Sequence, residues 1–246
     1  MTIIDSVSKT GLLSLLFVGL QQLPVFADLS ESLLKQWDFS PPDNGQPTQR
    51  EGAATRAPCL PKKHQLTALV PQSGKGLTAQ AYPTFFWYLP ETTAEKLKFT
   101  IRDREKVTIY SIEYILPPTN KTRIMSLSLP IFADSQSLKI GQEYNWRLQL
   151  FCQQDSDTPV TSVEGYVERV LTQADLSIKL ENASLTNQLI VFAEARLWYE
   201  TLLTLVKLRS SFPNNSEYDS AWLNLLDSVN LKEISQDSLN AEINLN

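Results

Sequence analysis

A glycine-lysine pair in the stretch SGKGLT, residues 73–78, is the feature of this sequence closest to a phosphate-binding motif. A P-loop has a glycine five residues before its Gly-Lys pair and a serine or threonine directly after the lysine. Leu69 and Gly76 occupy those two positions here. The spacing therefore excludes a P-loop, and we predict a loop between two strands.

Histidine chemistry is limited to one residue, His64, in the stretch PKKHQ. A Ser-His-Asp triad or a histidine metal site would have this single member and no second imidazole ligand. We therefore expect an exposed histidine without a catalytic role.

The acidic residues offer two further candidate pairs. Glu164 and Glu168 share one face of a predicted strand, but that spacing is about 13 Å, beyond the roughly 5–10 Å that glycosidase carboxylates need. Asp155 and Asp157 are too few for a calcium site and form no EF-hand loop. We expect both pairs at the surface. The sequence thus predicts no catalytic residues, no metal and no cofactor, and hence a protein that is not an enzyme.

The only cysteines are Cys59 and Cys152, without a Cys-x-x-Cys spacing. An even number of cysteines in an exported chain is usually bonded. A bridge between these two would close a long loop and stabilise the fold by about 4–5 kcal/mol in the chain-entropy model. We predict a structural disulfide.

Four consecutive aromatic residues lie in PTFFWYLP, residues 83–90. A strand alternates its side chains between two faces, so Phe85 and Trp87 belong in one core, while Phe86 and Tyr88 point the other way. The second face is either covered by helices of the same chain, which we favour, or exposed as a stacking platform for a sugar or a peptide.

The elements around this strand have a β pattern from about residue 66 to 170. Seven short apolar runs are separated by Pro, Gly, Asn and Asp, which favours an antiparallel, immunoglobulin-like β-sandwich. In YNWRLQLFC, residues 144–152, Trp146 and every second neighbour face the core, and Arg147 faces outward. The seven runs are 66–71, 83–90, 97–103, 106–117, 123–130, 144–152 and 160–170.

After Val170 the apolar period changes from 2 to 3.6, which predicts three or four helices. Breaks are expected at 182–184 and 213–215. Trp198 and Trp222 each begin an apolar stripe, and the two segments look like a tetratricopeptide-type helix pair. The candidate binding residues are therefore Phe86, Tyr88, Trp198 and Trp222.

The N-terminus reads as a signal peptide, residues 1–27, with Lys9, an apolar run at 11–20 and small residues at Val25 and Ala27. That run is too short to span a membrane, and no other stretch of the mature chain is a candidate span. The predicted order continues with a flexible linker at 28–58, a β-sandwich domain at 59–170 and a helical region at 171–246. The net charge of −5 and the lack of a basic patch argue against nucleic acid as a partner.

Several sequence blocks together resemble a cyanobacterial family of exported proteins, the DUF928 group, a domain of unknown function. The blocks are GAATRAPC, LTALVP, PTFFWYLP, SLSLP, YNWRLQLFC, VEGYVERV and WYETLLTLVKLR with AWLNLLDSVNL. The resemblance implies an exported protein with a β domain followed by helices, and it brings no assigned site residues. Such proteins tend to have glycine before the Trp-Tyr helix, where this chain has Ala195-Arg196-Leu197. We therefore expect one longer helix over 185–208.

The function we expect from these observations is non-enzymatic. The chain is predicted to be an envelope protein, periplasmic or extracellular, that binds or scaffolds other proteins, with another envelope protein as its partner. The alternative is a glycan-binding module that holds polysaccharide on an exposed face of Phe86 and Tyr88.

Overall fold

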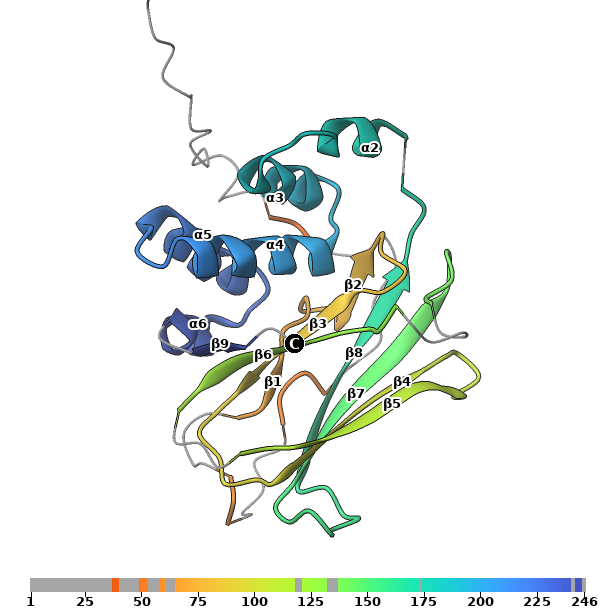
Figure 1. Cartoon of the computed structure of the whole chain (residues 1–246), viewed down its shortest axis with the longest axis vertical. Coiled ribbons are helices and arrows are strands. Elements are labelled where there is room, and N and C mark those ends of the chain that lie inside the picture. The colour runs from red at the N-terminus through yellow and green to blue at the C-terminus, as the bar shows by residue number, and fades with distance from the viewer. Residues whose placement is uncertain are drawn as a thin grey trace, which may run out of the picture.

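The computed structural model describes residues 37–39, 49–52, 58–60, 65–117, 121–131, 137–172, 174–239 and 242–244. The predicted signal peptide, His64 and most of the range predicted to be a linker lie outside these residues. The described chain consists of two β-sheets followed by a helical region (Figure 1). This mixed β arrangement with helices at the C-terminal end agrees with the sequence prediction.

The strands form a four-stranded sheet in the order β1-β3-β6-β9 and a five-stranded sheet in the order β2-β8-β7-β4-β5. Each of the seven predicted runs contains a strand. The strands are β1 Thr67–Ala68, β2 Lys75–Thr78, β3 Thr84–Leu89, β4 Lys96–Arg102, β5 Thr108–Ile115, β6 Arg123–Ser128, β7 Glu143–Phe151, β8 Thr161–Arg169 and β9 Glu242–Asn244.

Two strands were not predicted, and both pair in parallel with their neighbours. β2 pairs with β8, and β9 pairs with β6. The loop predicted at 73–78 is therefore wrong for Lys75–Thr78, which is strand β2. A four-residue strand that contains glycine has no alternation to reveal it, and its partner lies about ninety residues away in the sequence.

The core between the sheets is aromatic. Phe85 on β3 lies 5.2 Å from Phe99 and 5.5 Å from Trp146, measured between ring centroids. Trp87 stacks on Phe99 at 6.4 Å. The face of β3 predicted to enter the core does so, and the inward face of β7 is buried as its alternation predicted.

The disulfide between Cys59 and Cys152 is present, with a Cα–Cα distance of 5.6 Å and a sequence separation of 93 residues. It lies at the end of β7. The carbonyl oxygen of Cys59 accepts hydrogen bonds from the Thr92 hydroxyl at 2.6 Å and the Thr93 N–H at 3.2 Å. The bridge therefore fixes the segment before β1 to the five-stranded sheet and to the connection that precedes β4.

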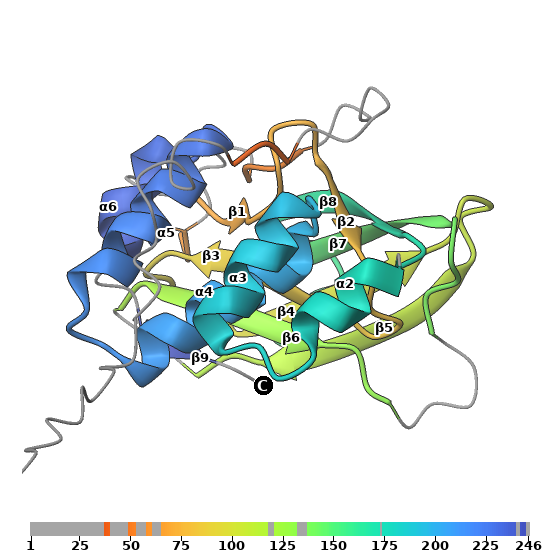
Figure 2. The same ribbon diagram turned by 90° about the horizontal axis from the view of Figure 1, so that it is seen from above.

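The described residues hold five helices where three or four were expected. Seen from above, α2, α3 and α4 lie over the sheets, while α5 and α6 lie to the side of β1 and β3 (Figure 2). Ser184 and Asn215 cap two of them by accepting backbone N–H groups, which explains the predicted breaks. The helices are α2 Ala174–Leu180, α3 Leu185–Glu194, α4 Trp198–Ser211, α5 Ser216–Ser228 and α6 Lys232–Leu239.

The expectation of one long helix over 185–208 is wrong, because α3 and α4 are separate. Arg196 adopts a left-handed φ of 57° between them. The Leu197 N–H donates to the Phe192 carbonyl and the Arg196 N–H to the Ala193 carbonyl, which is the Schellman arrangement that ends a helix. Glycine favours this conformation, so an arginine there concealed the break.

Parts of the range that the composition predicted as a flexible linker pack against the fold. Phe39 is buried and its ring meets Trp198 edge-on at 5.0 Å. Arg50 donates to the carbonyl oxygens of Val229 and Asn230 at 2.6 and 3.0 Å, directly after α5. The Gly52 N–H donates to the Leu66 carbonyl at 2.8 Å. These residues tie the N-terminal side of the chain to both the helices and β1.

Candidate functional site

Two of the four predicted binding residues lie on the second face of β3, and both are buried. Phe86 is 1% exposed and Tyr88 is 0% exposed. The Tyr88 hydroxyl donates to the Asp237 carboxylate of α6. Neither ring can stack on a sugar unless the helices move away, so the structure gives no platform for the glycan-binding alternative.

The other two, Trp198 and Trp222, begin and centre the helix pair and are also fully buried. The Trp198 indole N–H donates to the Leu69 carbonyl at 2.9 Å, and the Trp222 indole N–H donates to the Ser238 hydroxyl at 2.8 Å. Arg209 lies over the Trp222 ring at 4.9 Å. Both tryptophans therefore pack the fold and offer no surface to a partner.

Helix α4 enters the gap between the two sheets through its first turn. The Tyr199 ring contacts Phe85, and its hydroxyl accepts from the Trp146 indole at 3.0 Å and donates to the Tyr166 carbonyl at 3.1 Å. Gly76 on β2 permits this approach, because a Cβ there would lie 2.9 Å from the Tyr199 ring. The second glycine of SGKGLT is thus required by packing.

A buried carboxyl group holds the same helix to the end of β2. Glu200 accepts three hydrogen bonds through one oxygen: from the Thr78 hydroxyl at 2.7 Å, the Ala79 N–H at 2.8 Å and the Gln80 N–H at 3.1 Å. Its other oxygen is buried and has no hydrogen-bond partner among the residues that the structure describes. Burial raises the pKa of Glu200 above its ordinary value, and the three donors oppose that rise.

The lysine of SGKGLT is also fixed inside the protein. Lys75 is buried, and its ammonium group lies 3.1 Å from Glu143 and 2.6 Å from Glu168. Glu164, the other member of the predicted carboxylate pair, is bound by Arg147 at 2.7 Å. These ion pairs join β2, β7 and β8.

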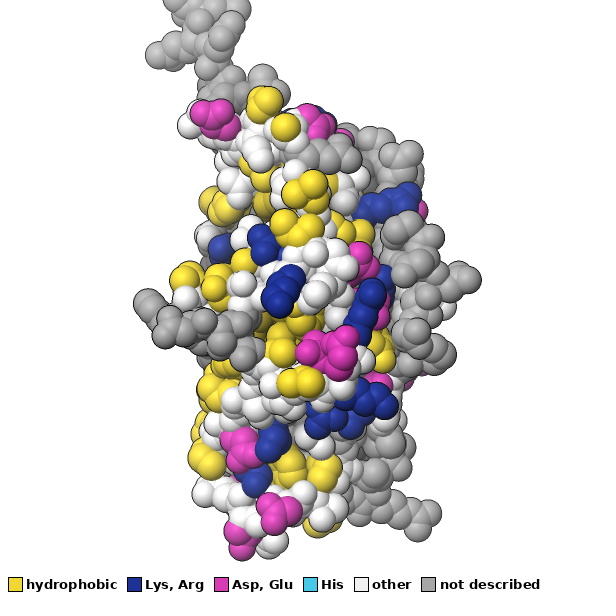
Figure 3. Space-filling view, turned by 90° about the vertical axis from the view of Figure 1, so that its right-hand side faces the viewer, with side chains coloured by type: hydrophobic (Ala, Val, Ile, Leu, Met, Phe, Trp, Pro, Cys, Tyr) yellow, Lys and Arg dark blue, Asp and Glu magenta, His cyan; other side chains and the backbone are white. Residues whose placement is uncertain are grey.

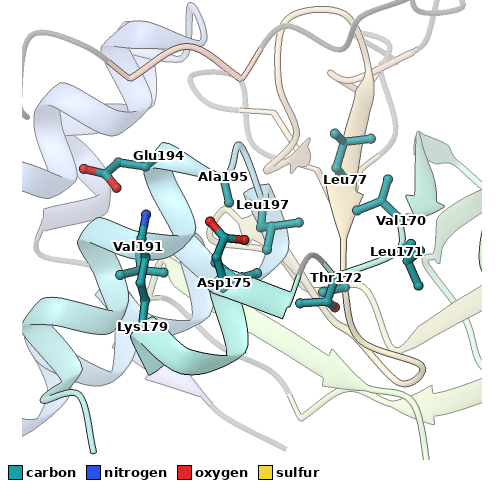
Figure 4. Close-up of a pocket in the computed structure, with 12 residues that line it drawn as sticks. Leu77, Val170, Leu171, Thr172, Asp175, Lys179, Val191, Glu194, Ala195 and Leu197 are labelled. Carbon is teal, nitrogen blue, oxygen red and sulfur yellow. The ribbon is translucent and has the colours of Figure 1, made fainter. Parts of the chain in front are cut away.

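One site that the structure offers is a groove of about 430 Å³ between the ends of β2 and β8 and helices α2 and α3 (Figure 4). This volume lies within the usual range of ligand-binding clefts. The lining residues are Leu77, Ala79, Val170, Leu171, Thr172, Asp175, Leu176, Lys179, Val191, Glu194, Ala195 and Leu197.

The groove has an apolar floor and a charged rim. The groove is lined by Leu77 from β2, Val191 from α3 and Leu197 from the connection between α3 and α4, and the exposed Asp175 and Glu194 also line it (Figure 4). A cleft lined mainly by apolar side chains with a few polar groups suits a ligand that buries aliphatic or aromatic groups.

Apolar side chains continue from the groove onto the molecular surface. Leu171 is 73% exposed and Ile178 on α2 is 71% exposed. In the space-filling view, hydrophobic atoms are visible at the upper end of this face and also further down it, with charged side chains interspersed among them (Figure 3). Exposed apolar groups beside an apolar cleft are typical of an interaction site.

β2 is an edge strand of the five-stranded sheet, and its outer side has no strand partner among the described residues. The Tyr166 and Val170 N–H groups of the β8 segment donate to the carbonyls of Gly74 and Thr78. Because alternate residues of a strand point to opposite sides, the N–H and C=O of Leu77 point away from β8. Leu77 lines the groove, so an extended chain lying there could pair with it.

The sequence analysis missed this groove because its residues carry no motif. Leu171 and Ile178 have the same apolar character as core residues, and only the fold shows that they are exposed. Within the residues that the structure describes, no cluster of three His, Cys, Asp or Glu side chains could hold a metal ion. None of the helices in that same part of the chain is long and apolar enough to cross a bilayer.

Comparison with protein families identifies the family of this chain. The family described as Domain of Unknown Function (DUF928) matches residues 51–239. This range begins at the segment that bridges to β1 and ends at the last residue of α6. No curated protein matches the chain.

Proposed function

The chain belongs to the DUF928 family, and we propose that it is a non-enzymatic protein that binds or scaffolds other proteins through the groove between β2, α2 and α3. The observation that carries this proposal is the groove with its apolar lining residues, one of which, Leu171, is 73% exposed; Ile178, also exposed, lies on α2, the helix that contributes Asp175, Leu176 and Lys179 to the lining. Exposed apolar groups next to a cleft mark interaction sites more often than isolated ones do.

The groove fits a short extended segment of a partner protein. Its volume holds two or three apolar side chains, and the outward N–H and C=O of Leu77 can pair with the backbone of that segment. The rim carries Asp175 and Glu194 beside one lysine, Lys179. A partner segment with apolar residues and a flanking basic residue would meet both surfaces.

The same proposal places the chain in the cell envelope, in the periplasm or outside the cell, with another envelope protein as its partner. The disulfide supports this, because such bonds persist in oxidising compartments. The N-terminal signal-peptide pattern adds to it, and the cyanobacterial origin rests on the family resemblance.

We also propose an immunoglobulin-like relationship for the two-sheet region. Two sheets that pack around an aromatic core support it. The parallel pairs β2–β8 and β6–β9 are additions to a purely antiparallel sandwich.

Site-directed photocrosslinking in the native cell tests the protein-binding proposal. A photoreactive amino acid at Glu194 lies on the rim of the groove, and the same amino acid at Asp227, an exposed acidic residue of α5, is the matched control. We expect one protein to be captured reproducibly at 194 and not at 227. Equal capture at both positions, or recovery of polysaccharide without protein, would contradict the proposal.

A further inference from the structure

Strand β5 forms an edge of the five-stranded sheet, and its outer side has no strand partner among the residues that the structure describes. The Leu116 N–H donates to the Glu95 carbonyl of the β4 side at 2.8 Å. By alternation, the even-numbered residues of this strand turn their backbone groups toward β4. Ser111, Glu113 and Ile115 therefore present N–H and C=O groups to the open edge.

This edge lacks the features that usually prevent strand pairing. Edge strands are normally protected by charges, proline or short length. β5 has eight residues with one charge, Glu113, and that carboxylate is already paired with Lys98 at 2.8 Å. The register shift at Ile101/Arg102 affects only the start of the strand. Exposed apolar side chains flank it, with Val107 58% and Ile115 61% exposed.

The inner face of β5 is incompletely covered within one copy. Tyr110, Ile112 and Tyr114 pack against the core but remain partly exposed. The helices do not protect this edge, because α4 contacts β2, which is four strands and about 19 Å away. Another strand could therefore join the sheet beside β5 and complete the burial of these three residues.

We propose that two copies of the chain pair their β5 strands in antiparallel fashion about a two-fold axis at Ile112. Tyr110 of each copy then faces Tyr114 of the other, and Ser111 faces Glu113. Ile112 faces its own counterpart. Aromatic and β-branched cross-strand pairs are stabilising, and this register places no like charges opposite each other.

Neighbouring registers are less favourable. A shift by two residues in one direction places Glu113 opposite Glu113, which is repulsive. A shift by two in the other direction places Ile109 opposite Glu113 and separates the tyrosine pair. The register centred on Ile112 therefore makes β5 self-complementary, and a second copy is the occupant that its side chains fit.

A charge test in solution addresses this interface. We expect the purified chain to show a concentration-dependent dimer in sedimentation and light scattering. Ser111→Glu, at an exposed position, places like charges in two cross-strand pairs and should raise the dimer dissociation constant about tenfold. Adding Glu113→Lys should restore association, because the charges then attract. Gln149→Glu, on the central strand β7, is the control and should leave the dimer unchanged.

A cysteine test addresses the register. In the proposed dimer, Ile112 of one copy lies opposite Ile112 of the other as a non-hydrogen-bonded pair. The Cα atoms of such a pair are about 4.5 Å apart, which allows a disulfide between cysteines at this position. Ile112→Cys should give a covalent dimer on mild oxidation, while Tyr110→Cys on the same face should not, because it meets residue 114. A monomer at all concentrations, a dimer that Ser111→Glu does not weaken, or equal cross-linking of both variants would overturn the proposal.

Discussion

At the scale of single residues, the most consequential side chains are polar groups buried where helix α4 meets strand β2. Glu200 satisfies three donors with one oxygen and leaves the other without a partner. Burial without a full set of partners is costly for a charged carboxylate. The raised pKa of Glu200 follows from that cost, and it links the stability of this junction to pH.

Replacing Glu200 should reveal this link. A carboxyl group whose pKa is raised on folding stabilises fully below its unfolded pKa and loses that contribution as pH rises through the folded pKa. Glu200→Gln keeps the acceptor oxygen but does not ionise, so the stability of the variant relative to the wild type should increase as pH rises above about 4.3. Glu200→Ala, which removes the acceptor of the Thr78 hydroxyl and the Ala79 N–H, should lose about 2–4 kcal/mol at acidic pH, and the loss should shrink as pH rises.

Urea denaturation of the wild type and both variants between acidic and weakly alkaline pH measures these differences. Parallel pH curves for the wild type and Glu200→Gln would show that Glu200 has the same pKa in the folded and unfolded chains.

Gly76 carries the second prediction at this scale. A methyl group at this position would lie 2.9 Å from the Tyr199 ring and 3.0 Å from the Trp198 ring, both of them buried. Gly76→Ala should therefore lower the free energy of unfolding by about 1–3 kcal/mol. Thermal denaturation checks this, with Gln72→Ala at an exposed position in the turn before β2 as the control. Equal melting temperatures would mean that α4 packs less closely than described.

The residue-level predictions from sequence succeeded where alternation decided the outcome. Trp146 and Phe85 face the core because a strand fixes which neighbours share a side. The roles of Lys75 and Glu200 could not be predicted, because their partners come from distant segments. The surface position of Leu171 was hidden for a related reason: an apolar side chain has no feature that distinguishes core from interface.

At the scale of elements, α4 connects the sheets with the other helices through its contacts. It contacts β2, β3, α3 and α5. The start of α4 was not predicted. A glycine would have indicated a break there, but the left-handed residue before α4 is Arg196. The end of α4, before Pro213, was predicted correctly, because proline and asparagine mark a break in any context.

The disulfide between Cys59 and Cys152 also joins two elements, because it links the segment before β1 to the end of β7. Cys152→Ser removes a cross-link that closes a 93-residue loop. The free energy of unfolding should fall by about 2–5 kcal/mol. Guanidinium denaturation of the oxidised protein and of the variant measures the loss, and a thiol assay on the wild type should detect no free thiol. Two thiols per chain, or an unchanged midpoint, would contradict the structural role.

At the scale of the whole molecule, two sheets enclose an aromatic core and a helical region closes one end of it (Figure 1). The general order of β structure and helices followed from the change of apolar period after Val170. The parallel strands and the groove did not, because both arise only when segments far apart in sequence meet. The exposed surfaces that remain, the groove and the β5 edge, lie at opposite sides of the five-stranded sheet.

The measurement that tests the central claim most directly is photocrosslinking from Glu194 in cells that carry either wild-type Val191 or Val191→Glu. The substitution places a carboxylate on the apolar floor of the groove, and Val191→Ile is the conservative control. Circular dichroism establishes that all three proteins fold. The account predicts that a single captured protein is lost with Val191→Glu and retained with Val191→Ile. Undiminished capture by the folded Val191→Glu protein would show that the groove is not the binding site.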